Sequence, residues 1–297
     1  MPASSRLASL AVLFLLWFFW GTNWVVTKIG LAEASAFQLA LGRTLLALIT
    51  LAAIMVASGR SLRPTPLWPT FWLGLTQTAG FVLLTNLALV AGGAGKVSVL
   101  CYTMPFWTLL LARLWLHERL AWPQWLGVLL AFAGLMLMLI LEPWALGSSW
   151  LSDLLAIAGG LVWALSVIVA KKLRLAHRVD TLGLTFWQMM WGTVPLVLLA
   201  PFFPGQPLTL SWTLVGVLLF SGVLAGGLGW WMWMTLLARL SAGMAGLNIL
   251  AIPAVAVLMA WLWLGEHPSS SEAAGMGLIA LALLLLSLYT VWRDRSC

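Results

Sequence analysis

Ten apolar stretches, each about 20 residues long, constrain this chain more than any other feature of its sequence. They cover approximately residues 7–29, 35–57, 67–91, 94–116, 122–142, 150–171, 179–200, 210–237, 242–264 and 271–292. A helix needs about 20 predominantly apolar residues to cross the hydrocarbon core of a bilayer, because each residue advances the helix by only about 1.5 Å. The sequence therefore predicts ten transmembrane helices.

The composition excludes a water-soluble domain. Hydrophobic residues make up 63% of the chain and charged residues only 8%, whereas soluble domains are about 45–50% apolar and about 25% charged. A transmembrane β-barrel is excluded as well, because its strands alternate apolar and polar residues in short segments. We therefore expect an all-α integral membrane protein.

Lysine and arginine residues are distributed unequally between the two sides of the predicted bundle. With the N-terminus in the cytoplasm, the inner side holds Arg6, Arg60, Arg63, Arg113, Arg119, Lys171, Lys172, Arg174, Arg178, Arg239, Arg293 and Arg295. The outer side or outer half holds only Lys28, Arg43 and Lys96. Because cytoplasmic loops carry an excess of Lys and Arg, we expect both termini in the cytoplasm. Orientation also accounts for the net charge of +7 without a nucleic-acid partner.

Two segments of the chain repeat one pattern. MPFWTLLLARLWLHE covers residues 104–118 and IPAVAVLMAWLWLGE covers residues 252–266. Each has a proline second and ends in Leu-Trp-Leu, one variable residue and a glutamate, and the two segments align 148 positions apart without a gap. This repeat indicates that the chain is an internal duplication.

The duplication divides the chain into residues 1–148 and residues 149–297, with five predicted helices in each block. Because five is an odd number, the second block enters the membrane from the opposite side. Inverted repeats of this kind commonly build secondary transporters, with a substrate site near the bilayer midplane and rocking of one half against the other. A duplicated structural bundle without a transport pathway is the alternative.

The motif FWGTNWVVTKIG at residues 19–30, the repeated LWLxE endings and the two five-helix blocks resemble the drug/metabolite transporter superfamily, in its EamA-type ten-helix branch. The Trp-rich sequence is most similar to those of bacterial exporters of aromatic and other neutral amino acids. The resemblance implies an inner-membrane location, alternating access and an amino-acid substrate. Other small metabolites or lipophilic drugs are the alternative cargoes. His117 departs from the small residue usual before the glutamate, whereas Gly265 keeps it.

Matching polar and aromatic side chains recur in the first and sixth predicted helices. Trp20, Asn23 and Thr27 are spaced so that they share one helix face, and Trp163 and Ser166 repeat the first two positions. Polar side chains within spans usually face the bundle interior. We therefore expect both faces to line one cavity; hydrogen bonding between helices is the alternative role.

Further candidates for the cavity wall are uncharged hydrogen-bonding residues near mid-depth and one deep aromatic side chain. They are Gln77, Thr78, Ser98, Tyr102, Asn248 and Trp230. Such groups could hold the ammonium and carboxylate of an amino acid while apolar walls accept its side chain. Helix-helix hydrogen bonding is an equally open role for each polar residue taken singly.

Proline and glycine residues mark candidate hinges. Pro105 and Pro253 fall near the middle of the fourth and ninth predicted helices, where a proline removes one hydrogen-bond donor and kinks the helix. Gly226 and Gly229 have no side chains, so they allow close packing against one face of the eighth predicted helix and allow that helix to bend. Static kinks that suit the packing are the alternative.

Glu118 and Glu266 end their helices, where negative charge opposes the helix dipole. A compensating partner is therefore required, for which Arg119 and the N-terminal amides of a neighbouring helix are candidates. We expect these two glutamates to be structural.

The sequence gives little support to an integral-membrane enzyme. No H-E-x-x-H motif is present, and Cys101 has no histidine at its level in the bundle. The second cysteine, Cys297, is the last residue, so neither a disulfide nor a metal site is expected. We expect no cofactor. The expected partners are the lipid bilayer and a small-molecule substrate, and a homodimer is left open. No carboxylate falls in mid-span, so facilitated transport fits as well as proton coupling.

Overall fold

The computed structural model describes residues 3–60, 62–117, 120–140, 149–203, 205, 207–237 and 251–296. All regular secondary structure in these residues is helical, as expected from the sequence. In the first half of the chain the helices are α1 (Ala3–Gly30), α2 (Ala36–Ala57), α3 (Leu67–Gly74), η1 (Leu75–Gly80), α4 (Phe81–Ala91), α5 (Ala94–Cys101), α6 (Met104–Trp115) and α7 (Trp122–Ile140). In the second half they are α8 (Ser149–Ala176), α9 (Thr181–Leu199), η2 (Ala200–Phe202), α10 (Trp212–Leu218), η3 (Leu219–Leu228), α11 (Gly229–Leu237), α13 (Ala251–Leu264) and α14 (Ser270–Ser296).

Eight stretches of helix in the described residues are long and apolar enough to cross a membrane. Two further apolar helices are shorter, Trp122–Leu137 within α7 and Ala251–Leu264, which is α13. Exposed tryptophans stand in the first turn of four helices, at Trp68, Trp122, Trp150 and Trp212. This is the position of the aromatic belt that membrane proteins place at the bilayer surface. The chain is thus a multi-pass membrane protein.

Two of the long helices change geometry in the middle. The π-helical segment η1 joins α3 to α4, and the longer π-helical segment η3 joins α10 to α11. A π-helical turn adds a residue to the helical repeat and shifts the side chains that follow it, and such turns are frequent at functional sites. The apolar pattern of the sequence did not indicate either segment.

The fourth predicted span is divided rather than kinked. Helix α5 ends at Cys101, a turn covers Tyr102 and Thr103, and α6 begins at Met104. Pro105 therefore stands in the first turn of α6, where its missing N–H removes no helical hydrogen bond. The expectation that Pro105 kinks a continuous helix is corrected accordingly.

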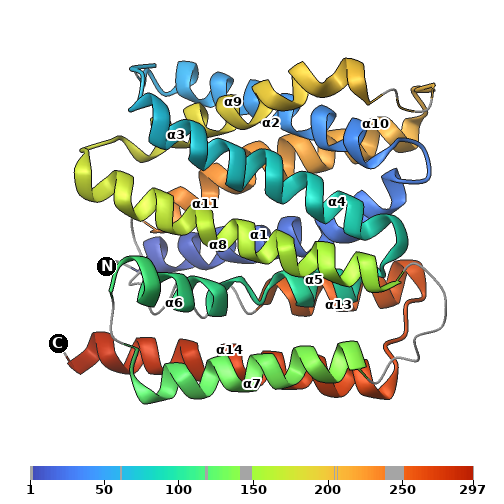
Figure 1. Ribbon diagram of the computed structural model, residues 1–297. Coiled ribbons are helices and arrows are strands. Elements are labelled where there is room, and N and C mark those ends of the chain that lie inside the picture. The colour runs from blue at the N-terminus through green and yellow to red at the C-terminus, as the bar shows by residue number, and fades with distance from the viewer. Residues whose placement is uncertain are drawn as a thin grey trace.

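The helices lie side by side, with α7 and α14 forming a neighbouring pair along one edge of the bundle (Figure 1). Helix α1 packs against α13, α2 packs against η3, and α8 packs against α4, α5 and α6. The described chain begins in α1 and ends in α14 on the same side of the bundle (Figure 1). This arrangement places α1, α2, α4, α8, α9 and η3 around a common interior.

Candidate substrate cavity

A cavity of about 570 Å³ occupies the interior between these helices. Its volume suits a small organic molecule, since ligand pockets usually enclose about 300–1,000 Å³. Of the residues expected to form a site, those that line it are Trp20, Asn23, Gln77, Thr78, Tyr102, Trp163 and Trp230, with Thr27 beside them. A second hollow of about 660 Å³ lies on the flank of the bundle beside α13 and α14 and has an almost wholly apolar lining. That hollow offers little to orient a polar ligand.

Aromatic rings form one side of the central cavity. Trp163 and Trp230 are stacked, with ring centroids 5.6 Å apart and planes 22° from parallel. Trp20 meets the edge of Trp230 at 5.7 Å. Phe81 continues the wall, with its ring centroid 4.6 Å from that of Trp163. These planar surfaces can stack on an aromatic cargo.

Glycines in and beside η3 allow Trp20 to occupy its position. The indole Nε1 of Trp20 donates a hydrogen bond to the Ala225 carbonyl oxygen at 2.9 Å. A Cβ on Gly229 would fall 2.6 Å from that same nitrogen, and a Cβ on Gly226 would fall 2.8 Å from the Cβ of Ala47. The two glycines expected to be hinges therefore also provide close approach between helices. The structure leaves their hinge role as a proposal.

Polar residues of the cavity lining contain atoms without a hydrogen-bond partner among the described residues. They include Asn23 Oδ1, Thr27 Oγ1, Asn86 Oδ1 and Gln188 Nε2, all of them buried. Asn86 Nδ2 donates to the Ala36 carbonyl at 3.2 Å, and its Oδ1 has no partner among the described residues. Unpaired buried polar atoms are unfavourable, so these groups are candidates for hydrogen bonds to a ligand or water once the side chains that cover them move.

Two serines expected in the cavity wall are not part of it. Ser98 and Ser166 are fully buried, and each hydroxyl donates to a carbonyl of its own helix, Gly95 O at 2.7 Å and Trp163 O at 2.6 Å. Pro253 lines the flank hollow and not the central cavity. Asn248 and Glu118 lie outside the described residues.

The cavity carries positive charge that the sequence pattern did not predict. Its lining includes Arg43 of α2 and, near the end of α8, Lys171 and Arg174. No aspartate or glutamate is among its described lining residues. Arg43 had been counted only as an outer charge, because the apolar pattern of α2 does not say which face points inward.

Among the described residues of α8, exposed side chains line the cavity at one end of the helix. Six residues in the second half of that helix line it: Trp163, Val167, Ala170, Lys171, Arg174 and Leu175. Lys171, Arg174 and Leu175 are exposed, so this end, the open end, gives access to solvent. No residue of α8 before Trp163 lines the cavity.

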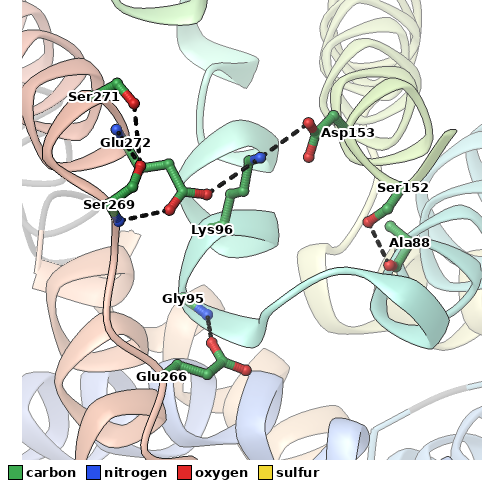
Figure 2. A network of polar contacts seen from close by, with 9 residues as sticks. All are labelled: Ala88, Gly95, Lys96, Ser152, Asp153, Glu266, Ser269, Ser271 and Glu272. Atoms are coloured by element: carbon green, nitrogen blue, oxygen red, sulfur yellow. Dashed lines mark hydrogen bonds and ion pairs between the residues drawn. The ribbon is translucent and has the colours of Figure 1, made fainter. Parts of the chain in front are cut away.

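A buried ion-pair network occupies the other end, which we call the closed end (Figure 2). Lys96 Nζ of α5 lies 3.1 Å from Asp153 Oδ2 of α8 and 3.2 Å from Glu272 Oε1 of α14. The side chains of Lys96 and Asp153 are only 10% and 4% exposed, so this pair is far better shielded from water than a surface pair. Three helices are thereby joined across the closed end.

Backbone groups at the closed end are also held by side chains. Glu266 accepts hydrogen bonds from the Ala94 and Gly95 amides at the start of α5, at 2.8 and 3.1 Å. Its negative charge thus faces the positive end of a helix dipole. Lys28 Nζ of α1 donates to the Leu89 carbonyl at 2.6 Å, in the last turn of α4, where carbonyls lack a partner within the helix. Figure 2 shows the Glu266 contact beside the ion pairs.

Comparison with known proteins finds a family whose profile matches this chain. The profile of the EamA-like transporter family matches residues 7–140 and 150–288. A probable terminal-alkyne amino-acid exporter from Streptantibioticus cattleyicolor is 27% identical, covering 93% of this chain and 92% of its own length. A riboflavin transporter from Rhizobium johnstonii is 29% identical, covering 93% and 87%. A crystal structure with 19% sequence identity shares the fold, with a TM-score of 0.69 over 95% of this chain and 97% of that one.

Proposed function

The chain belongs to the EamA-like transporter family, and from this premise we propose that it exports aromatic and other neutral amino acids across the bacterial inner membrane by alternating access. The observation that carries the proposal is a cavity with aromatic and polar walls that is open at one end and closed at the other. A cavity accessible from one side at a time is what alternating access requires.

Recurring structure supports two inverted five-helix blocks, residues 1–148 and 149–297. The family profile matches the chain twice, with one match wholly within each block. The third long helix of each block contains a π-helical segment, η1 or η3. The residue before the repeated glutamate is left-handed in both, with φ of 55° at His117 and 64° at Gly265.

Helix pairing supports the same relation. If each helix is replaced by its counterpart in the other block, the contact between α1 and α13 corresponds to the contact of α8 with α5 and α6. In the same way, the contact between α2 and η3 corresponds to the contact between α9 and η1. The fifth helices, α7 and α14, pack against each other. A pseudo-two-fold axis in the membrane plane would generate these pairs.

The proposed orientation follows from the excess of Lys and Arg on one side. It places both termini and the open end, with Lys171 and Arg174, in the cytoplasm. The cavity then faces the side from which an exporter takes its cargo. Outward release would require the closed end to open, which separates Lys96 from Asp153 and Glu272.

The nature of the cavity wall supports an aromatic amino acid as cargo. Trp20, Trp163 and Trp230 offer surfaces for an aromatic side chain, and uncharged donors and acceptors lie deeper in the same cavity. One relative is a probable amino-acid exporter. Another is a riboflavin transporter, so other planar aromatic metabolites are the second candidate class.

Flux measurements with the purified protein in lipid vesicles test the proposal. We expect movement of tryptophan and other neutral amino acids, measured with and without a pH gradient. Trp163→Ala should slow tryptophan flux by about twofold to tenfold, since aromatic contacts of this kind are worth about 0.5–1.5 kcal/mol beyond their burial. Asn23→Ala should also reduce it. Trp212→Ala is the matched control, because Trp212 is 91% exposed and lies outside the cavity. Absence of amino-acid flux in the wild type would refute the proposed cargo.

A further inference from the structure

Arg43 brings a positive charge to the cavity wall without a carboxylate partner among the described residues. Five of the six carboxylates in the described residues are engaged elsewhere: Glu33 with Ser211, Asp153 and Glu272 with Lys96, Asp180 with Arg60, and Glu266 with the Ala94 and Gly95 amides. The sixth, Asp294, belongs to the last turn of α14, which does not line the cavity. A cation within a membrane protein usually pairs with an anion or faces a water-filled cavity. The positions of the described carboxylates therefore leave Arg43 facing a cavity with no anion from the protein.

Arg43 lies at about the same depth as the unpaired oxygens of Asn23 and Asn86. Asn23 is seven residues before the end of α1, Asn86 is five before the end of α4, and Arg43 is seven after the start of α2. At 1.5 Å per residue these positions are about 8–11 Å from the closed end. The three ends lie together, because a short turn links α1 to α2 and Lys28 of α1 contacts the end of α4.

We propose that Arg43 binds the carboxylate of the cargo, and that Asn23 Oδ1 and Asn86 Oδ1 accept hydrogen bonds from its ammonium group. The inference rests on the proposed function and narrows its substrate class to molecules that carry a carboxylate. A guanidinium can donate two parallel hydrogen bonds to a carboxylate, which gives both strength and orientation. The carboxylate and ammonium bind at the deep end of the cavity, and the side chain extends toward Trp163 and Trp230.

This arrangement predicts a selectivity that a purely aromatic cavity would lack. Tryptamine keeps the indole and the ammonium but has no carboxylate, so its charge would meet Arg43 unpaired. Indole-3-propionate keeps the carboxylate and lacks the ammonium. The wild type should therefore bind tryptophan best, indole-3-propionate less well and tryptamine least.

The test compares these three probes on wild-type protein and on Arg43→Gln and Arg43→Lys, by ligand-induced thermal stabilisation in detergent and by competition for tryptophan flux. Arg43→Gln should lower the preference for tryptophan over tryptamine by about tenfold to a hundredfold, because a hydrogen bond to a charged group is lost and a like-charge repulsion is removed. Arg43→Lys should keep part of the preference, since it retains the charge but not the two-pronged geometry. Arg113→Gln is the matched control, an exposed arginine of α6 outside the cavity.

The outcomes separate this inference from the proposed function. A wild type that binds and moves tryptophan but takes tryptamine equally well refutes the role of Arg43 and leaves amino-acid export standing. The same holds if folded Arg43→Gln keeps the full preference. A wild type that neither binds nor moves any of the three probes refutes the proposed function, and the inference fails with it. Arg43→Lys also keeps the test decisive if the glutamine variant does not fold.

Discussion

The closed end and the cavity differ in whether their charged side chains have partners of opposite charge among the described residues. At the closed end, Lys96 has two carboxylate partners, and Glu266 accepts two backbone amides. In the cavity, Arg43 and Arg174 line a wall with no carboxylate among its described residues. Both regions are built from the same helices, since α1, α4, α5 and α8 contribute to each.

The difference indicates which groups the protein satisfies itself and which it leaves for a ligand. Buried charges with protein partners stabilise one arrangement of helices, and breaking such a pair from one side is strongly unfavourable. In the cavity lining, Asn23 Oδ1 and Asn86 Oδ1 have no hydrogen-bond partner among the described residues. We therefore interpret the closed end as a gate and the cavity as a binding site.

The largest effect is expected from Lys96→Met, which removes the cation from between two carboxylates at the closed end. Leaving buried charges without a partner is destabilising by about 3–5 kcal/mol. Thermal unfolding in detergent would measure the loss. Arg60→Met is the control, because the Arg60–Asp180 pair is 59% and 51% exposed and such pairs contribute about 0–1 kcal/mol. Equal losses of stability in the two variants would show that the ion pairs of Lys96 do not hold the closed end together.

A smaller effect is expected from Gly229→Ala in the cavity wall. The added Cβ would fall 2.6 Å from Trp20 Nε1 and displace the indole from its hydrogen bond to Ala225. Overpacking of this kind is destabilising by about 1–3 kcal/mol, and tryptophan affinity should fall because the aromatic wall is disturbed. Gly216→Ala is the control, since a Cβ there would have no neighbour within 4 Å. Unchanged tryptophan binding in Gly229→Ala would remove Trp20 from the site.

The two left-handed helix ends provide a third comparison. His117 and Gly265 hold equivalent positions in the repeat, with φ of 55° and 64°. A side chain in this conformation is unfavourable by about 1 kcal/mol relative to glycine. His117→Gly should therefore raise the unfolding temperature slightly, and Gly265→His should lower it. Changes of the same sign in both variants would contradict equivalent backbone roles.

The smallest effect is expected from Ser166→Ala. The Ser166 hydroxyl bonds to Trp163 O within its own helix, and alanine compensates for the lost hydrogen bond through its higher helix propensity. Flux and stability should stay within about 0.5 kcal/mol of the wild type. A large loss of tryptophan flux without a loss of stability would return Ser166 to the cavity wall.

The sequence predicted features that depend on one helix at a time. The apolar lengths located the helices, and the spacing of Trp20, Asn23 and Thr27 placed them on one face, which does line the cavity. The glutamate at 266 required a partner near its helix end, and the structure provides the start of α5. These inferences hold because helix periodicity and the helix dipole act locally.

Features that depend on several helices were not predictable in this way. Lys96 and Asp153 are 57 positions apart in the chain, and no pattern along α5 or α8 states that they meet. Arg43 was missed as a site residue because only the packing of α2 against η3 and α9 decides which face it shows. Ser98 and Ser166 were assigned to the cavity although their hydroxyls had acceptors one turn away.

A reversible disulfide across the closed end tests the gate most directly. A Cβ on Gly92, just after α4, would fall against Ser152 Oγ of α8, so cysteines at both positions are within reach of a disulfide. In a Cys297→Ser background, oxidised Gly92→Cys/Ser152→Cys protein should bind tryptophan but not transport it, and reduction should restore flux. Gly92→Cys alone should be insensitive to oxidation. Transport at the wild-type rate by the fully oxidised double variant would contradict the account.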